Sequence, residues 1–250
     1  MIKKKIYLHF SIDDVLRSLI EVKDKKIKLL DHWFFSFLHK IHREYKLNIS
    51  LYLFYEEIIN GKLRNLSEIH SIRNQIKNNW ISFGAHGLNY NNPPHKIPVT
   101  KQKKHINKIY KEIIRFAGNK NLASKVRLHE YSECFEIKSL LKKYNVKSLF
   151  STDREIGSHR LKKFNSNQLL KKGFTKYRGM NFIRTDLRVE NMIKNSEKKI
   201  LRTIQKLLDK KNFLIIYTHE YDLKNKNCRL TLNKIFKIIN KNYTFINMDK

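Results

Sequence analysis

Short apolar runs in this chain repeatedly end on side chains that can carry catalytic chemistry. The runs are Ile6–Ile12, Leu47–Phe54, Trp80–Ala85, the segment at Val126, Phe182–Ile183 and Phe213–Thr218. The groups that follow them are Asp13-Asp14, Tyr55-Glu56, His86, Arg127 with His129, Asp186 with Arg188, and His219-Glu220. Parallel strands of a β/α barrel deliver their catalytic groups at their carboxyl ends in this way. The pattern therefore predicts an α/β enzyme built as such a barrel.

Segments of helical periodicity separate these runs. They are residues 33–41 after a capping Asp31, residues 106–114 after Thr100, Ser132–Tyr144, Ser196–Lys211, and residues 232–239 before a last strand at Tyr243–Ile246. Strands that alternate with helices over a whole chain predict a parallel sheet. The 250 residues match the usual size of one barrel, so we expect a single domain over residues 1–250. A flat doubly wound sheet is the alternative, but no glycine-rich turn follows the first run to bind a dinucleotide.

The net charge of +31 raises the question of a nucleic-acid partner. The lysines are spread over every expected helix rather than gathered in one stripe, whereas phosphate recognition relies on clustered patches and arginine forks. We therefore expect solvated lysine faces and no specific nucleic-acid partner. So basic a surface should still attract polyanions or an anionic membrane surface non-specifically at low salt.

Cysteine usage and the N-terminus bear on the compartment. Cys134 and Cys228 lack a C-x-x-C partner, which argues against a disulfide framework or a cysteine zinc site and fits a reducing compartment. The basic segment Met1–Lys5 leads into a short run that contains His9 and ends at Asp13, unlike a signal peptide. No stretch approaches the ~18 apolar residues of a membrane span. We expect a cytoplasmic protein without a transmembrane segment.

The adjacent carboxylates Asp13 and Asp14 are the sharpest local signal. Side chains alternate along a strand, so one of the two can bind a cation while its neighbour takes a proton. The alternative is the first turn of a helix that opens at Val15, where aspartate is also favoured. His86 follows the small residues Gly84 and Ala85, which allow close approach of a ligand, although a lone histidine is more often structural than a ligand.

His219 ends a buried run and stands beside Glu220, as expected of an imidazole placed at a pocket and oriented by a neighbour. Arg127 and His129 are two residues apart, and we expect them to project from one side of their strand.

Asp186, Arg188 and Glu190 alternate along another extended segment. They could contribute to a site or form a ladder of ion pairs along a strand. The sequence leaves both interpretations open.

Four motifs resemble those of the polysaccharide deacetylase superfamily, also known as the chitooligosaccharide deacetylase homology domain. The segment His9–Val15 (HFSIDDV) resembles T-F-D-D-G, and Phe83–Tyr90 (FGAHGLNY) resembles a motif that contains H-[ST]-x-x-H. Arg127–Tyr131 (RLHEY) is similar to R-x-P-[YF], and Tyr217–His219 (YTH) is similar to L-x-H. They occur in the family's order and span about residues 5–220. The chain looks closest to a divergent bacterial branch with F-S-x-D-D-V, F-G-x-H-G and T-H-E-[WY] motifs.

The resemblance implies a distorted (β/α)7–8 barrel that holds a divalent metal, often zinc. Carried over by position, Asp14 and His86 would be metal ligands and Asp13 the general base. Arg127 would orient that base, and His219 would be the general acid that protonates the leaving amine.

The chain departs from the family's pattern at the metal. Tyr90 replaces the second ligand histidine, and His129 stands where the family has proline. We expect His129 to be the third metal ligand, with Glu220, the Tyr90 region and His95 as other candidates. Imidazole ligands suit zinc, whereas a carboxylate-rich set would suit manganese or magnesium. We expect supporting or substrate-binding roles for Tyr90, Tyr131, Asp186, Arg188 and Glu220.

These observations predict a metal-dependent deacetylase, a hydrolase that cleaves the C–N amide bond of an N-acyl group on a sugar or glycan precursor. One alternative is a non-catalytic glycan-binding member of the same fold. Another is a basic nucleic-acid-binding protein. A third is a metal-free barrel glycosidase that uses Asp13 and Glu220, which would require a carboxyl separation of roughly 5–10 Å.

Overall fold

The computed structural model describes residues 3–76, 80–152 and 160–248, so Met1 and Ile2 of the basic N-terminal segment lie outside the described residues. Its larger sheet has the strand order β10-β11-β1-β2-β5, with β12 also paired to β1. Every pairing in this sheet is parallel. The strands are β1 (Lys4–Val15), β2 (Ile49–Phe54), β5 (Ile81–Gly87), β10 (Leu187–Arg188), β11 (Phe213–His219) and β12 (Tyr243–Asn247).

A smaller sheet with the order β6-β7-β9-β8 completes the wall. Its strands are β6 (Lys125–Val126), β7 (Ser148–Ser151), β9 (Met180–Arg184) and β8 (Phe174–Tyr177), of which only β8 runs antiparallel to its neighbour. The two sheets meet at both edges of the smaller one. Ala123 N, just before β6, donates to Phe83 O of β5 at 2.8 Å, and the chain passes directly from β9 to β10 of the larger sheet. The strands thus follow one another around an incompletely hydrogen-bonded ring, and the predicted distorted barrel is confirmed.

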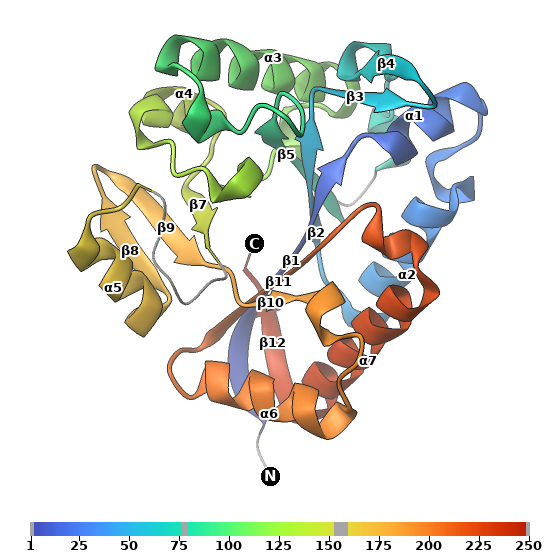
Figure 1. Ribbon diagram of the computed structural model, residues 1–250. Helices are drawn as coiled ribbons and strands as arrows, with labels where there is room; N and C mark the ends of the chain where they lie inside the picture. The colour runs from blue at the N-terminus through green and yellow to red at the C-terminus, as the bar shows by residue number, and fades with distance from the viewer. Residues whose placement is uncertain (1–2, 77–79, 153–159, 249–250) are drawn as a thin grey trace.

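The helices lie around the outside of the strands (Figure 1). They are α1 (Arg17–Asp24), α2 (Trp33–Tyr45), α3 (Val99–Ala117), α4 (Lys138–Lys143), α5 (Lys163–Lys172), α6 (Glu197–Leu208) and α7 (Lys226–Asn242). A β-hairpin of β3 (Glu56–Ile59) and β4 (Lys62–Asn65) follows the carboxyl end of β2. No helix in the described part of the chain is both long enough and apolar enough to span a membrane.

The predicted helices are present, with shifted ends. Ser196 caps α6 as expected and accepts a hydrogen bond from Lys199 N at 3.3 Å. The predicted caps Asp31 and Thr100 are wrong, because α2 is capped by His32 and α3 begins at Val99. The helix predicted over Ser132–Tyr144 shrinks to α4, because the segment ahead of it forms tight turns at the carboxyl end of β6.

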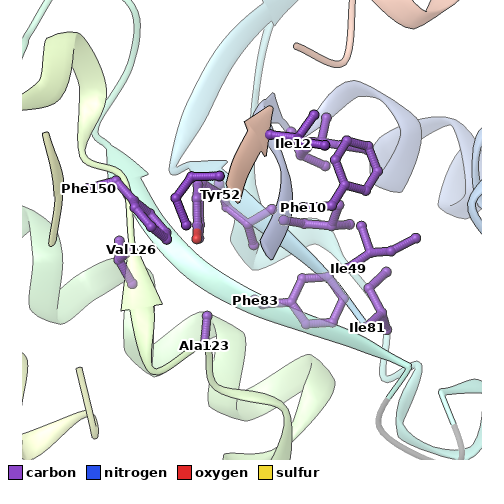
Figure 2. Packing of buried hydrophobic residues seen from close by; sticks show 14 of the residues in the cluster. Phe10, Ile12, Ile49, Tyr52, Ile81, Phe83, Ala123, Val126 and Phe150 are labelled. Carbon is purple, nitrogen blue, oxygen red and sulfur yellow. The ribbon is translucent and has the colours of Figure 1, made fainter. Parts of the chain in front are cut away.

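Side-chain alternation along β1 divides the molecule into an apolar shell and a polar barrel interior. Phe10 packs edge-on against Phe236 of α7, with ring centroids 5.2 Å apart. On the other face, His9 lies 4.5 Å from the ring of Phe150, and its Nε2 is 3.1 Å from Tyr52 Oη. Figure 2 shows Tyr52 and Phe150 on the side of the strands opposite Phe10. His9, Ser11 and Asp13 therefore belong to the interior face, which leads directly to the carboxyl end of the barrel.

Gly84 makes room for this interior at the junction of the two sheets. It pairs with Tyr52 across the β2–β5 ladder. A Cβ atom at Gly84 would lie 2.9 Å from Val126 Cγ2 and 3.1 Å from Tyr52 Cδ1. Glycine is therefore required here by close packing.

We expect Gly84→Ala to destabilise the protein by about 1–3 kcal/mol, the usual cost of overpacking a core. The measurement is the urea dependence of unfolding. Adding Val126→Ala removes the nearest atom, so the double variant should lose less stability than the sum of the two single variants. Strictly additive losses would show that the Val126 contact is not the cause.

Candidate active site

The two aspartates at the end of β1 serve different neighbours because the strand is distorted there. Asp14 adopts a left-handed backbone conformation with φ +60°, and the β1–β2 register shifts between Ile12 and Val15. An irregularity of this kind re-aims side chains that would otherwise alternate. The buried Asp13 consequently faces Arg127, while Asp14 faces His86.

Asp14, His86 and His129 form a compact cluster, which we call the triad. Asp14 Oδ1 lies 3.0 Å from His86 Nε2, and His86 Nε2 lies 3.3 Å from His129 Nδ1. One ligand atom from each of the three side chains lies within 4.8 Å of the others. The structure thus contains a possible Asp/His/His metal site, and His129 occupies the place of its third ligand.

Both imidazoles of the triad are oriented from behind by backbone carbonyls. His86 Nδ1 lies 2.7 Å from Arg127 O, and His129 Nε2 lies 2.9 Å from Tyr90 O. A carbonyl oxygen can only accept, so each of these nitrogens carries a proton. His86 Nε2 and His129 Nδ1 therefore face the triad, which is how metal-ligating histidines are held.

The triad has the donor set and spacing that a metal needs. With bonds of about 2.0–2.2 Å, neighbouring ligand atoms of a tetrahedral zinc ion lie about 3.3–3.5 Å apart. Two nitrogen lone pairs that face one another repel unless a cation lies between them. In addition, the buried Asp14 Oδ1 has no aligned hydrogen-bond partner in the described part of the chain. The three side chains therefore fit a divalent metal.

The electrostatics of the triad favour the metal-binding protonation states. Burial and the neighbouring His86 lower the pKa of His129 to about 4, so this ring is neutral at pH 7. Burial raises the pKa of Asp14, but the imidazoles of His86, His219 and His129 outweigh that effect and bring it below its usual value. A neutral imidazole and an ionised carboxylate are the forms that bind metals.

Arg127 fixes the second aspartate from inside the barrel. Its Nη1 donates to Asp13 Oδ1 at 2.8 Å and to Ser11 Oγ at 2.9 Å, and its guanidinium lies 4.2 Å from the ring centroid of Tyr217. Burial lowers the pKa of Arg127, but attraction to Asp13 more than compensates, so the pKa is raised overall. The pair presents one oriented carboxylate beside the triad.

His219 is held by two further carboxylates. Its Nδ1 lies 2.6 Å from Glu190 Oε1 and 3.1 Å from Asp222 Oδ2. Burial lowers the pKa of His219, but the bonds to Asp222 and Glu190 outweigh it and raise the pKa to about 10. Arg188 joins this group through Glu190 Oε1, 2.6 Å from its Nε. The imidazole is therefore a cation at neutral pH and has a proton to give.

A cavity of about 410 Å³ brings these groups together at the carboxyl end of the barrel. We call it the active-site cavity. The predicted site residues that line it are Asp13, Asp14, His86, Tyr90, Arg127, His129, Tyr131, Arg188 and His219. Tyr131 reaches it from a turn in the left-handed conformation, with φ +53°, and its hydroxyl lies 2.5 Å from that of Tyr217. Arg127 and His129 were expected on one strand, but β6 ends at Val126 and they meet the cavity from the loop that follows.

Two predicted site residues have structural positions instead. The buried Glu220 carboxylate accepts from the backbone N–H groups of Leu16, Arg17 and Ser18 at the start of α1, and it lies outside the triad. Asp186 is buried against Lys211 Nζ at 2.5 Å and accepts from Ile215 N, so it does not line the active-site cavity. Glu220 satisfies backbone N–H groups of α1, and Asp186 pairs with the buried Lys211. Residue spacing in the sequence does not reveal either contact.

Two residues of the site were not assigned from the sequence. Glu190 was left open between a site role and an ion-pair ladder, and Asp222 was not singled out. Asp222 lies three residues after His219 and contacts it across one turn. That spacing is a signal that the sequence contains. Glu190 and His219 are 29 residues apart in the sequence, so their contact becomes visible only in the folded structure.

Solved structures of known proteins share this architecture. A peptidoglycan N-acetylglucosamine deacetylase, Bc1960, matches 99% of this chain and 88% of its own with a TM-score of 0.54 and 13% identity. A family 4 carbohydrate esterase from Streptomyces lividans, solved with acetate, matches 97% and 91% with a TM-score of 0.51 and 12% identity. The chain has the fold of the family 4 carbohydrate esterases.

That fold also occurs in enzymes of other activity. A 4-α-glucanotransferase from Thermococcus litoralis matches 99% of this chain but only 40% of its own, with a TM-score of 0.52 and 13% identity. No protein-family model matches the sequence, and no curated protein does. The carbohydrate-esterase fold is thus established by structural similarity, and this fold is compatible with more than one enzymatic activity.

We expect one zinc ion to bind per chain and to raise the melting temperature, because a metal that binds only the folded state stabilises it. His129→Ala should weaken binding by more than about 100-fold, since changes behind a ligand alone cost 10–100-fold. His95→Ala is the matched control, because His95 is a nearby histidine that contacts Ser132 rather than the triad. Equal zinc affinity in wild type and His129→Ala would exclude His129 as a ligand.

We expect Glu190→Gln to lower the pKa of His219, because the variant removes a negative charge from Nδ1. NMR titration of the imidazole provides the measurement. A raised pKa in the folded state stabilises the protein fully below pH 6.5, and this contribution is lost as pH rises through about 10. Wild-type stability should therefore decline over that window, and the decline should be smaller in Glu190→Gln.

Proposed function

We propose that this chain is a metal-dependent hydrolase that removes an N-acyl group, such as acetyl, from a sugar or glycan precursor. One observation carries the proposal. A complete Asp/His/His cluster, a buried carboxylate held by arginine and a protonated imidazole held by two carboxylates all face one cavity. Amide hydrolysis needs these three functions: a Lewis acid, a base and an acid.

In the proposed mechanism, Asp14, His86 and His129 would hold the metal. Zinc suits two imidazoles and one carboxylate, with manganese or magnesium as alternatives. The metal would polarise the amide carbonyl and make water more acidic. Asp13 takes a proton from the attacking water, and Arg127 holds that carboxylate in place.

His219 completes the reaction as general acid. Its proton passes to the amide nitrogen as the C–N bond breaks, so the amine leaves neutral and a carboxylic acid remains, which loses its proton to solvent. The proton taken up by Asp13 balances the one that His219 gives. Glu190 and Asp222 orient the ring through Nδ1. The metal-free glycosidase alternative receives no support, because Glu220 is committed to the N-terminus of α1.

The test is acetate release from N-acetylglucosamine oligomers by metal-stripped protein, with and without added zinc. Zinc-dependent release supports the proposal. Tight zinc and glycan binding without any acyl release would instead favour a glycan-binding protein of the same fold. Binding of neither zinc nor glycan would remove the basis for both.

We expect Asp13→Asn to lower turnover roughly 10²–10⁴-fold, the usual contribution of a general base. Zinc content should be nearly unchanged, because Asp13 contacts Arg127 rather than the triad. Metal analysis and acetate release on the same samples separate these effects. Loss of zinc from the variant would show that Asp13 is a ligand and that the roles of the two aspartates are exchanged.

A further inference from the structure

A second cavity, of about 490 Å³, lies beside the active-site cavity. Asp14, Tyr90 and Tyr221 line both, so the two cavities adjoin at these residues. The β3–β4 hairpin forms the other wall of the second cavity through Ile58 and Leu63. We call this space the hairpin groove.

Ile58 and Leu63 form a pair of large apolar side chains that is exposed to solvent. They are direct cross-strand partners in the hairpin, and they are 68% and 63% exposed. Phe54 and the half-exposed ring of Tyr221 extend the same apolar lining toward the triad. A paired apolar surface that faces a groove gains free energy when a ligand covers it.

Three carboxylates of the hairpin groove already accept hydrogen bonds from protein donors. Glu56 accepts from Asn89 at 2.9 Å, and Glu57 accepts from Arg17 at 3.1 Å. Glu220 is saturated by backbone donors of α1. A sugar bound against these three carboxylates would compete with those donors, whereas an alkyl chain bound against Ile58 and Leu63 needs no hydrogen bonds.

The direction of the scissile amide follows from the position of the acid. His219, Arg127 and Arg188 line the active-site cavity, and none of them lines the hairpin groove. If His219 protonates the nitrogen, the leaving sugar lies in the active-site cavity. The alkyl substituent of the carbonyl carbon would then point away from the nitrogen, past Asp14 and into the hairpin groove.

We infer that the preferred substrate carries a flexible alkyl chain longer than acetyl on its amide, and that the hairpin groove binds this chain. The inference rests on the proposed function. A methyl group would leave almost all of the groove empty, while cavities of about 300–1,000 Å³ accommodate much larger ligand groups. Substrate choice would then be made by the walls of the groove rather than by the triad.

The first experiment compares N-acetyl-, N-butanoyl- and N-octanoylglucosamine. Calorimetry measures binding to metal-free and zinc-loaded protein, and release of the free acid measures kcat/KM. Each methylene that is fully buried improves binding by about fourfold. We expect N-octanoylglucosamine to bind at least tenfold more tightly than N-acetylglucosamine and to show a matching preference in kcat/KM.

The second experiment removes the apolar wall with Ile58→Thr combined with Leu63→Thr, since threonine preserves strand propensity. The octanoyl-to-acetyl ratio should fall at least fivefold. Phe174→Thr is the matched control, because it replaces an exposed apolar strand residue outside the groove and should keep the wild-type ratio. The zinc-induced rise in melting temperature verifies that each variant is folded.

The outcomes separate the two proposals. Turnover without any preference for chain length, or a double variant that keeps the wild-type ratio, overturns the alkyl-chain inference and leaves the proposed function standing. Chain-length-dependent binding that disappears in the double variant, without turnover of any amide, supports the groove and contradicts the hydrolase.

Discussion

The buried ion pair between Asp13 and Arg127 joins the two halves of the barrel at the place where chemistry is expected. Asp13 lies near the carboxyl end of β1 in the larger sheet, and Arg127 follows β6 in the smaller one. Few backbone bonds cross between these sheets, so this pair supplies a directional link. Removing one partner of such a pair leaves a buried charge and typically costs 3–5 kcal/mol. The need to satisfy the buried Arg127 explains why Ser11 and Asp13, on the interior face of β1, are polar.

The triad depends on the same region for its geometry. The carbonyl of Arg127 accepts from His86 Nδ1, so one residue orients Asp13 with its side chain and His86 with its backbone. His129 follows two residues later and reaches the triad from the same loop. The carbonyl of Tyr90 in turn orients His129. The Asp/His/His cluster is therefore complete without a histidine at position 90.

The two cavities divide recognition from chemistry. The active-site cavity holds the paired charges that can move protons, whereas the hairpin groove adds the apolar wall of Ile58 and Leu63. Such a division permits the hairpin to change substrate choice without disturbing the triad. It is consistent with a fold that also carries a glucanotransferase, because loops at the carboxyl ends of barrel strands set specificity.

The sequence by itself determined the barrel and the residues that end its strands, because strand periodicity and the strand-end position of polar groups are local properties. It also indicated His129 as a replacement ligand. Only the tertiary structure decided which carboxylates serve the site. Glu220 and Glu190 lie at comparable strand-end positions. Glu220 nevertheless accepts hydrogen bonds from the backbone of α1, whereas Glu190 contacts His219. The left-handed turn at Asp14 and the hairpin groove likewise depend on contacts between segments far apart in the chain, and residue spacing carries no information about such contacts.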